Sequence, residues 1–393
     1  MSALAHEPVF AERTALQTLQ IGMGWFSEDP GGLNRVYANL IAELLHAGVE
    51  VQGFVVGTSD VMHLSGGSVA AFAPQGSSLV FRMHALRRAA LEWLRTRPDA
   101  VVVSHFAQNA FPMLDQLGDH PFVVHFQGPW GQESRVEGAP PWSVMAKELV
   151  ERTVYGRAAQ AIVLSSAFRD ILADQFGVER DRIHVIPGGV EVDRFASAPP
   201  RAACREALGW PSDRPIVLCV RRLVRRVGVD VLVEAAVALR ARVPDALVLL
   251  AGTGPLRSEL EARIDALGLG DTVRLLGFVP DEMLPLAYRA ADLTVVPTTA
   301  LEGFGLITVE SLAAGTPCVV TPIGGLAEIV SPLAPQLVAA EATKVEIGAT
   351  LADALLGAVP LPTTEQCTAY AKRCFDWPVI AERVRDVYEL ARQ

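Results

Sequence analysis

Two glutamates that flank a pair of glycines are the residues of this chain best suited to hold a ligand rich in hydroxyl and phosphate groups. The run Glu302–Glu310 contains Gly303 and Gly305 and leads into a predicted helix. At 1.5 Å per residue, Glu310 lies about 6–8 Å along that helix. Bare N–H groups at the helix start bind anions such as diphosphate, and carboxylates accept hydrogen bonds from sugar and ribose hydroxyls. On these residues alone, a solvated helix with an acid at its start is an equally good explanation.

Arginines form a second group, at the carboxyl end of a predicted strand. The run Val220–Gly228 contains Arg221, Arg222, Arg225 and Arg226. Fixed cations at such a place stabilise the negative charge of a departing nucleoside diphosphate. A solvated basic turn is the alternative. The chain has only three lysines, and none lies in such a turn, so arginine must supply any charge that neutralises a diphosphate.

Glycines and histidines of the first half form a third group. Gly31 and Gly32 place amide groups at a predicted helix start, although their loop lacks the spacing of a dinucleotide fingerprint. His125 and Trp130 follow a predicted strand, so the imidazole could hydrogen-bond a sugar and the indole could stack on its face. His105 is a similar candidate. A histidine satisfied within the core is the alternative for both.

Metal and disulfide chemistry are not indicated. No two aspartates are spaced as Asp-x-Asp, the usual clamp for a metal–diphosphate complex, so metal need not be invoked. The five cysteines are scattered and make no Cys-x-x-Cys pair, which argues against a zinc site and a disulfide framework. Cys219 and Cys318 lie in apolar runs and are predicted to be buried thiols. We expect a reducing, cytoplasmic compartment.

Short apolar runs alternate with segments of helical period along the chain. In the first half the runs that predict strands are Leu19–Gly24, Val49–Gly57, Ala100–Phe106, Pro121–Gly128, Ala161–Ser165 and His184–Pro187. In the second half they are Ile216–Val220, Leu247–Ala251, Val273–Phe278, Leu293–Pro297 and Cys318–Thr321. Repeated strand–helix–strand units predict parallel sheets covered on both faces.

The pattern restarts after Pro187, which predicts an α/β protein of two Rossmann-like parallel-sheet domains facing a central cleft. The polar stretch Glu191–Arg201 is the predicted linker. The final helical segment, Trp377–Gln393, could pack on either domain. Because ligands bind beyond the carboxyl ends of parallel strands, the cleft is the expected site.

Length and composition agree with this architecture. The 393 residues are 50% hydrophobic and 20% charged, which suits two cores and excludes a disordered or fibrous chain. A net charge of -10 argues against nucleic-acid binding. Residues 1–15 have no apolar core, so we expect a loose tail and no signal peptide, and no apolar run approaches the roughly 18 residues of a membrane span.

One segment, Phe81–Arg97, could touch a membrane surface. It carries five arginines against a single acid, with apolar residues near helical spacing. Basic amphipathic helices of this kind bind anionic lipid. The commoner alternative is a surface helix packed on its sheet.

Together these segments resemble the family 4 GT-B glycosyltransferases over nearly the whole chain. The resemblance rests on five motifs in order, which are His184–Val190, Val220–Gly228, Ala251–Pro255, Gly277–Pro280 and Glu302–Glu310. It implies a retaining, metal-independent hexosyltransferase that needs no cofactor and uses a nucleotide-sugar donor, with UDP-hexose the commonest donor in the family. The departing phosphate would itself accept the proton of the acceptor hydroxyl.

The resemblance also implies domain roles and residue roles. Residues 16–192 with 377–393 would bind the acceptor, and residues 200–376 would bind the donor. The donor-binding residues would be Gly31, Gly32, Arg222, Arg226, Val279, Glu302, Gly303, Phe304, Gly305, Leu306 and Glu310. The catalytic residues would be His125, Arg222, Arg226 and Glu302. Where the family commonly has lysine, this chain has Val227, and Arg226 is favoured over Arg225 as the replacement.

The acceptor stays open at this stage. The acceptor-side candidates are Trp25, His105 and Trp130, and they suit a sugar, an inositol, a lipid head group or another small molecule. The alternative activities are a sugar phosphorylase or nucleotide-sugar epimerase of the same fold, a dinucleotide-dependent oxidoreductase, and a carbohydrate-binding scaffold without catalysis.

Overall fold

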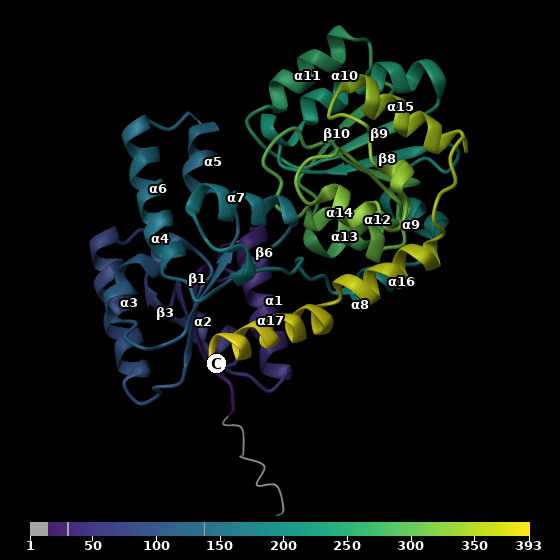
Figure 1. Ribbon diagram of the computed structural model, residues 1–393. Helices are drawn as coiled ribbons and strands as arrows, with labels where there is room; N and C mark the ends of the chain where they lie inside the picture. Colours follow the sequence, from purple (N-terminus) through teal and green to yellow (C-terminus); the bar gives the residue numbers. More distant parts are fainter. Residues whose placement is uncertain (1–14, 30, 137) are drawn as a thin grey trace, which may run out of the picture.

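Two parallel sheets, each covered by helices, form two domains (Figure 1). The structure is a computed structural model that describes residues 15–29, 31–136 and 138–393, so all but the last residue of the predicted N-terminal tail lies outside the described residues. Within those ranges, every helix is too short or too polar to cross a membrane.

The first domain is built on seven parallel strands in the order β3-β2-β1-β4-β5-β6-β7. The strands are β1 Gln17–Gly24, β2 Glu50–Val56, β3 Val69–Ala73, β4 Val101–Ser104, β5 Phe122–Phe126, β6 Gln160–Val163 and β7 Ile183–Val185. The helices are α1 Gly32–His46, α2 Asp60–Leu64, α3 Leu79–Leu94, α4 Ala107–Ala110, η1 Phe111–Gln116, α5 Trp130–Val136, α6 Pro141–Gly156, α7 Ser166–Phe176 and η2 Arg180–Arg182.

The second domain is built on five parallel strands in the order β10-β9-β8-β11-β12. The strands are β8 Ile216–Val220, β9 Leu247–Ala251, β10 Val273–Gly277, β11 Leu293–Val296 and β12 Cys318–Val320. The helices are α8 Val192–Ala196, α9 Arg201–Leu208, η3 Arg225–Val227, α10 Val229–Arg242, α11 Arg257–Ala266, η4 Asp281–Met283, α12 Leu284–Ala290, α13 Leu306–Ala313, α14 Leu326–Val330, η5 Pro335–Leu337, α15 Lys344–Leu355 and α16 Thr364–Phe375. A last helix, α17 Trp377–Ala391, follows.

The fold prediction is confirmed, with one strand added. Every predicted strand is present, and β8 and β9 begin and end at the predicted residues. The additional strand, β3, lies at the edge of the first sheet. The strand order reverses at β1 in the first sheet and at β8 in the second. The loops that follow these two strands therefore lie at the topological switch points where ligands of such sheets bind.

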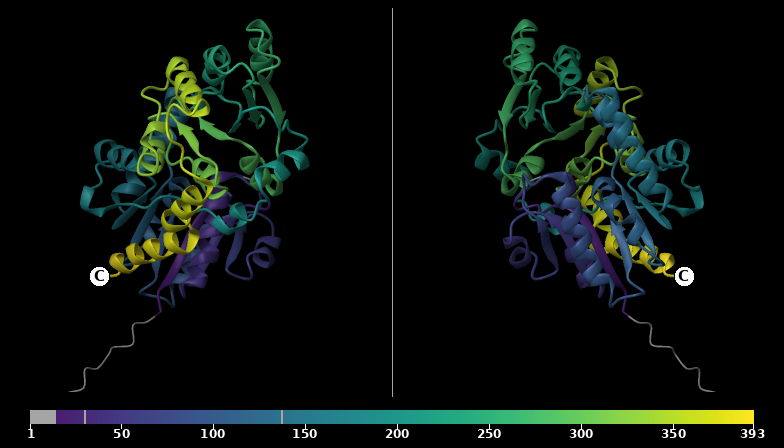
Figure 2. Two further views of the ribbon diagram at one scale, coloured as in Figure 1. Left: turned by 90° about the vertical axis from the view of Figure 1, so that its right-hand side faces the viewer. Right: turned by 90° about the vertical axis from the view of Figure 1, so that its left-hand side faces the viewer.

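The predicted linker is partly helical, and it packs with the second domain. Val192 and Phe195 of α8 are buried in the core of that domain. The helix α17 turns back to the first domain, where Trp377, Ile380 and Tyr388 complete a buried cluster beside α1. In both views of Figure 2 this yellow helix lies against the purple start of the chain. The last helix therefore packs on the first domain, which is one of the two positions that the sequence left open.

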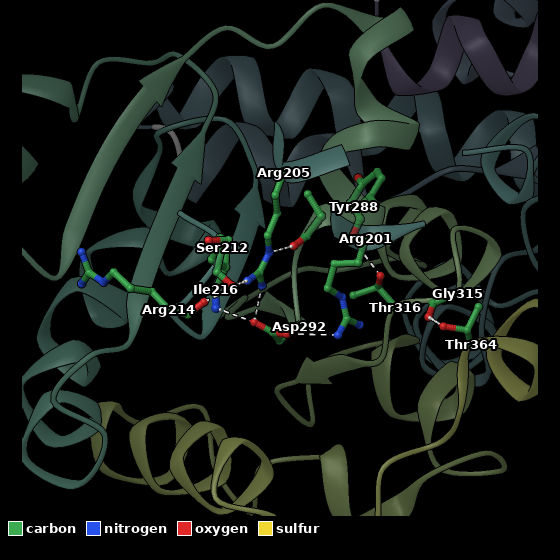
Figure 3. Close-up of polar contacts among 11 residues, drawn as sticks. Arg201, Arg205, Ser212, Arg214, Ile216, Tyr288, Asp292, Gly315, Thr316 and Thr364 are labelled. Atoms are coloured by element: carbon green, nitrogen blue, oxygen red, sulfur yellow. Dashed lines mark hydrogen bonds and ion pairs between the residues drawn. The ribbon is translucent and has the colours of Figure 1, made fainter. Parts of the chain in front are cut away.

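A partly buried network of charges fixes the amino-terminal edge of the second sheet (Figure 3). Asp292 accepts hydrogen bonds from Arg205 Nη2 at 2.6 Å and from the backbone N–H of Ile216 at 2.7 Å. Arg205 also donates to three backbone carbonyls, so four of the five N–H groups of its guanidinium are bonded within the fold. Because Ile216 begins β8 and Asp292 precedes β11, this network lies at the opposite edge of the sheet from the cleft and anchors α9 there.

The basic segment Phe81–Arg97 forms most of α3, which packs on the sheet. Leu86, Ala90 and Leu94 are buried in the core of the first domain. Arg87 pairs with Asp115 at 2.7 Å between Nη2 and Oδ2. The apolar face that membrane binding would require is therefore turned toward the protein, in agreement with the alternative of a packed surface helix.

Candidate active site

Two cavities meet in the cleft between the domains. The larger, of about 800 Å³, lies mainly against the second domain, and the smaller, of about 400 Å³, lies mainly against the first. The residues that line both include Gly32, Arg221, Arg226, Glu302 and Leu306. Glu302 therefore stands where the two cavities join.

The structure brings most of the predicted residues to these cavities. The larger one is also lined by Gly31, Arg222, Val279 and Glu310, and the smaller one by His105, His125, Trp130, Gly303, Phe304 and Gly305. Trp25 differs. It is buried in the first core with its ring edge against Tyr37, at a centroid distance of 6.4 Å, and lines neither cavity. Closeness to a strand end did not determine the direction of its side chain.

Glu302 is held by an arginine that sequence analysis did not single out. Nη2 of Arg221 donates to the Glu302 carboxylate and, at 2.9 Å, to the Thr298 hydroxyl, which in turn lies 3.0 Å from the same carboxylate oxygen. The side chains of Arg221 and Glu302 are only 13% and 12% exposed. The loop that carries Glu302 is hydrogen-bonded to the arginine-rich turn of Val220–Gly228, because the N–H groups of Thr299 and Ala300 donate to the Arg226 carbonyl at 3.1 and 3.3 Å.

The turn after Glu302 depends on its two glycines. Gly305 precedes α13 with φ of 87°, a left-handed conformation that glycine adopts without strain. A Cβ on Gly303 would lie 2.6 Å from the Phe168 ring of the first domain, so only glycine allows the two domains to approach here. The backbone of this turn is consequently exposed to the cavity that the domains enclose.

Three of the four arginines of the arginine-rich turn face the cavities. Arg226 lines both of them and donates to the Leu301 carbonyl at 3.3 Å, and Arg222 lines the larger one. Arg225 points elsewhere and pairs with Glu259 at 2.8 Å on the surface. Val227, at the position where the family commonly has lysine, is buried in the second core. The cations of the larger cavity are thus arginines.

Glu310 is buried at the far side of the larger cavity. The Tyr288 hydroxyl donates to Oε2 of Glu310 at 2.8 Å, and Arg35 of the first domain lies 3.6 Å from Oε1. Burial raises the pKa of Glu310, and the Arg35 charge opposes that rise only in part. Arg35 and Arg194 also pair with Asp281, the residue after Pro280, so this charged group joins the two domains.

The two histidines of the smaller cavity form a stacked, uncharged pair. Their ring centroids are 4.3 Å apart. His125 Nε2 lies 2.8 Å from the Tyr388 hydroxyl of α17, and His105 Nε2 lies 2.8 Å from Oε1 of Gln20. Burial lowers the pKa of His125 to about 3 and, with the nearby His125, lowers that of His105. Both imidazoles can form hydrogen bonds at neutral pH without carrying charge.

A buried carboxylate supports the aromatic wall of the smaller cavity. Glu151 of α6 accepts the backbone N–H groups of Trp130 and Gly131 at 2.8 and 2.9 Å, which fixes the start of α5. Burial raises the pKa of Glu151 to about 7. Trp130 packs against Phe106 at a centroid distance of 5.2 Å. Sequence analysis missed Glu151, since a glutamate within a helical segment gives no sign that it faces inward.

Two parallel-sheet domains that face a cleft are the GT-B architecture, and two glycosyltransferase family models match the chain. Glycosyl transferases group 1 matches residues 200–373, and Glycosyltransferase Family 4 matches residues 30–194. The chain belongs to the family 4 GT-B glycosyltransferases. Within the described ranges, no group of three or more His, Cys, Asp or Glu side chains is placed to hold a metal ion.

Individual relatives agree with this assignment. D-inositol 3-phosphate glycosyltransferase of Kineococcus radiotolerans is 31% identical over 331 residues, which cover 76% of this chain and 74% of that protein. Mannosylfructose-phosphate synthase of Agrobacterium fabrum is 35% identical over 191 residues, which cover 46% of this chain and 41% of that enzyme, less than half of its length. Anabaena HepE in complex with UDP and glucose has a similar fold, with a TM-score of 0.77 and 19% identity over 95% of this chain and 100% of that one.

Proposed function

We propose that this protein transfers a hexosyl group from a UDP-sugar to a hydroxyl group of a small polyol, with retention of anomeric configuration and without a metal ion. The observation that carries the proposal is the place of Glu302 at the junction of the two cavities, paired with Arg221 and beside the glycine turn. The Anabaena structure that shares the fold is described as bound to UDP and glucose, which supports the choice of donor.

The donor would occupy the larger cavity. Its base would lie along the backbone at Val279, and the ribose hydroxyls would reach Glu310, with Arg35 beside the same carboxylate. The diphosphate would meet Arg222, Arg226 and the amides of Gly31 and Gly32. These arginines supply the positive charge that a metal ion supplies in other transferases, which is the basis for proposing a metal-independent reaction.

The sugar would lie beside Glu302, and the Glu302 carboxylate would accept hydrogen bonds from the sugar hydroxyl groups. The bond between the anomeric carbon and the phosphate oxygen breaks, and the acceptor oxygen bonds to that carbon on the same face. The acceptor proton passes to the departing phosphate oxygen, so no protein base is required. His125, uncharged and held by Tyr388, would hydrogen-bond the transferred sugar.

The acceptor would occupy the smaller cavity, against Trp130 and His105. The names of the relatives given above contain inositol 3-phosphate and mannosylfructose phosphate, which supports a small polyol as acceptor. The first domain with α17 would thus bind the acceptor, and the second domain would bind the donor.

A thermal-shift screen against nucleotides and nucleotide sugars tests this proposal. A ligand at 100 times its Kd stabilises the folded state by about 2.7 kcal/mol, which shifts Tm by several degrees. We expect UDP and a UDP-hexose to raise Tm in buffer containing a chelator. A screen in which NAD(P)H raises Tm and every nucleotide sugar leaves it unchanged would overturn the proposal.

A further inference from the structure

Arg35 brings a positive charge from the first domain to the larger cavity. It lies one turn into α1, and its backbone N–H donates to the Gly31 carbonyl at 2.9 Å, so it is stacked above the glycines that open the helix. Its side chain lines the cavity and is 22% exposed. The guanidinium carbon lies 4.7 Å from the centroid of the Phe26 ring, so an aromatic side chain of the same domain supports the charge.

The Arg35 guanidinium reaches two carboxylates of the second domain. Nη2 pairs with Oδ1 of Asp281, and Nη1 lies 3.6 Å from Oε1 of Glu310. Asp281 is also held by Arg194, which donates to its Oδ2 at 2.7 Å and to its carbonyl at 2.6 Å. Asp281 lies two residues after Val279, where the base of the donor would lie. Arg35 therefore contacts the residues at both ends of the space that a nucleoside would fill.

The two carboxylate oxygens of Glu310 have different surroundings. Oε2 accepts a hydrogen bond from the Tyr288 hydroxyl at 2.8 Å. Within the described ranges Oε1 accepts no hydrogen bond, and Arg35 stands beside it at a distance too long for one. A cation at that distance favours the ionised carboxylate and leaves the lone pairs of Oε1 open to a hydroxyl group of a ligand.

The charge of Glu310 depends on Arg35 more than on its other neighbours. The groups that face Glu310 are Arg35 of α1, Tyr288 of α12, Asp281 of η4 and Arg194 of α8. Burial raises the pKa of Glu310, Asp281 adds to the rise, and the other three groups oppose it, with Arg35 having the largest effect. Without Arg35 the carboxylate would take up a proton at a higher pH, and one of its oxygens would then be a donor in place of an acceptor.

We propose that Arg35 is a positioning residue for the donor nucleoside: it holds the Glu310 carboxylate ready for the ribose hydroxyls and, through Asp281, fixes the loop beside the base. The ribose site is then shared between the two domains, although the nucleotide lies mainly against the second. This inference rests on the proposed function, because it assigns the larger cavity to the donor. The alternative is a direct contact between Arg35 and the diphosphate, since Gly31 lies one turn away.

Binding of UDP-glucose at several pH values tests the inference. A terminal phosphate titrates near pH 6, but both phosphates of UDP-glucose are substituted, so changes in affinity between about pH 5 and pH 8 report groups of the protein. Calorimetric titration gives the Kd at each pH. We expect Arg35→Met to raise the Kd about tenfold at neutral pH and to move the fall in affinity, which comes with protonation of Glu310, to higher pH. A direct contact with the diphosphate would instead weaken binding equally at every pH.

Three further variants separate charge from structure. Arg35→Lys keeps a cation and should restore the pH profile of the unaltered enzyme. In a Glu310→Gln background, Arg35→Met should no longer shift the profile. The matched control is Arg87→Met, because Arg87 also joins a first-domain helix to a carboxylate, that of Asp115, but lines neither cavity. This control should leave the Kd unchanged at each pH.

The outcomes separate this inference from the proposed function. Failure of the unaltered enzyme to bind UDP-glucose at any pH would overturn the proposed function and the inference with it. Binding by the unaltered enzyme, with a pH profile that Arg35→Met leaves in place or lowers uniformly, would overturn the inference alone. Arg35→Gln, whose amide can still donate to Asp281, decides between the same outcomes if Arg35→Met does not fold.

Discussion

Replacing Arg221 by methionine tests whether the arginine holds Glu302 in place. Methionine keeps most of the apolar stem and removes the guanidinium. The Glu302 carboxylate, in a side chain only 12% exposed, would then keep the Thr298 hydroxyl as its side-chain donor. Breaking a buried ion pair from one side costs about 3–5 kcal/mol, and the partial exposure here places the expected loss near the lower end, about 3 kcal/mol.

Scanning calorimetry measures this loss. For a domain of this size, about 3 kcal/mol lowers Tm by roughly 6–12 °C. Arg225→Met is the matched control, because Arg225 belongs to the same turn but is 66% exposed and pairs with Glu259 on the surface. A surface replacement of that kind changes stability by at most about 0.5 kcal/mol.

A double-mutant cycle with Glu302→Gln isolates the interaction of the two side chains. We expect Arg221→Met with Glu302→Gln to be less destabilised than the sum of the single variants by about 2–3 kcal/mol, since the double variant leaves no unpaired buried charge. Additive losses would refute the reasoning and show that Arg221 stabilises the loop independently of Glu302.

Three further replacements address other parts of the site. Arg226→Ala should lower kcat by about 10²–10³ with little change in Tm, because its charge faces the leaving diphosphate, and near-normal turnover would reject that role. Glu310→Gln should raise the donor KM strongly, and an unchanged KM would remove Glu310 from the ribose site. Glu151→Gln should abolish a pH dependence of stability. The pKa of Glu151 is raised to about 7 in the folded state, so Glu151 loses its proton less readily there than in the unfolded chain. The free energy of unfolding of the unaltered protein therefore falls by about 3 kcal/mol as pH rises from about 4.5 to 7. Parallel Tm profiles of the two proteins over that pH range would contradict this expectation.

The fold was largely predictable because most strands are short runs of β-branched and apolar residues with glycine, proline or aspartate at or near one of their two ends. The strand β3 was missed because Val69–Ala73 is rich in alanine, which has little preference for strands. The helix α8 was missed because it spans only Val192–Ala196, and so short a helix is stabilised by packing against the second domain and not by its own sequence.

Site residues were predictable from the sequence where a side chain suited to ligand binding lies next to residues that fix the backbone, such as the glycines of a turn. Glu302 and the glycine turn could be placed because the glycines mark the turn itself. Trp25 could not be placed, since a strand end has two faces and one of them is the core. Four arginines in one turn likewise give no sign that Arg221 binds Glu302 while Arg225 lies on the surface.

The return of α17 to the first domain separates the order of synthesis from the order of folding. The ribosome makes the strands of the first domain first, yet Trp377, Ile380 and Tyr388 belong to the core beside α1. The whole second domain is therefore made before that core can close, and His125 acquires its Tyr388 partner last. Nascent first-domain chains would expose the apolar surface that α17 later covers, and we expect them to be the species that chaperones bind.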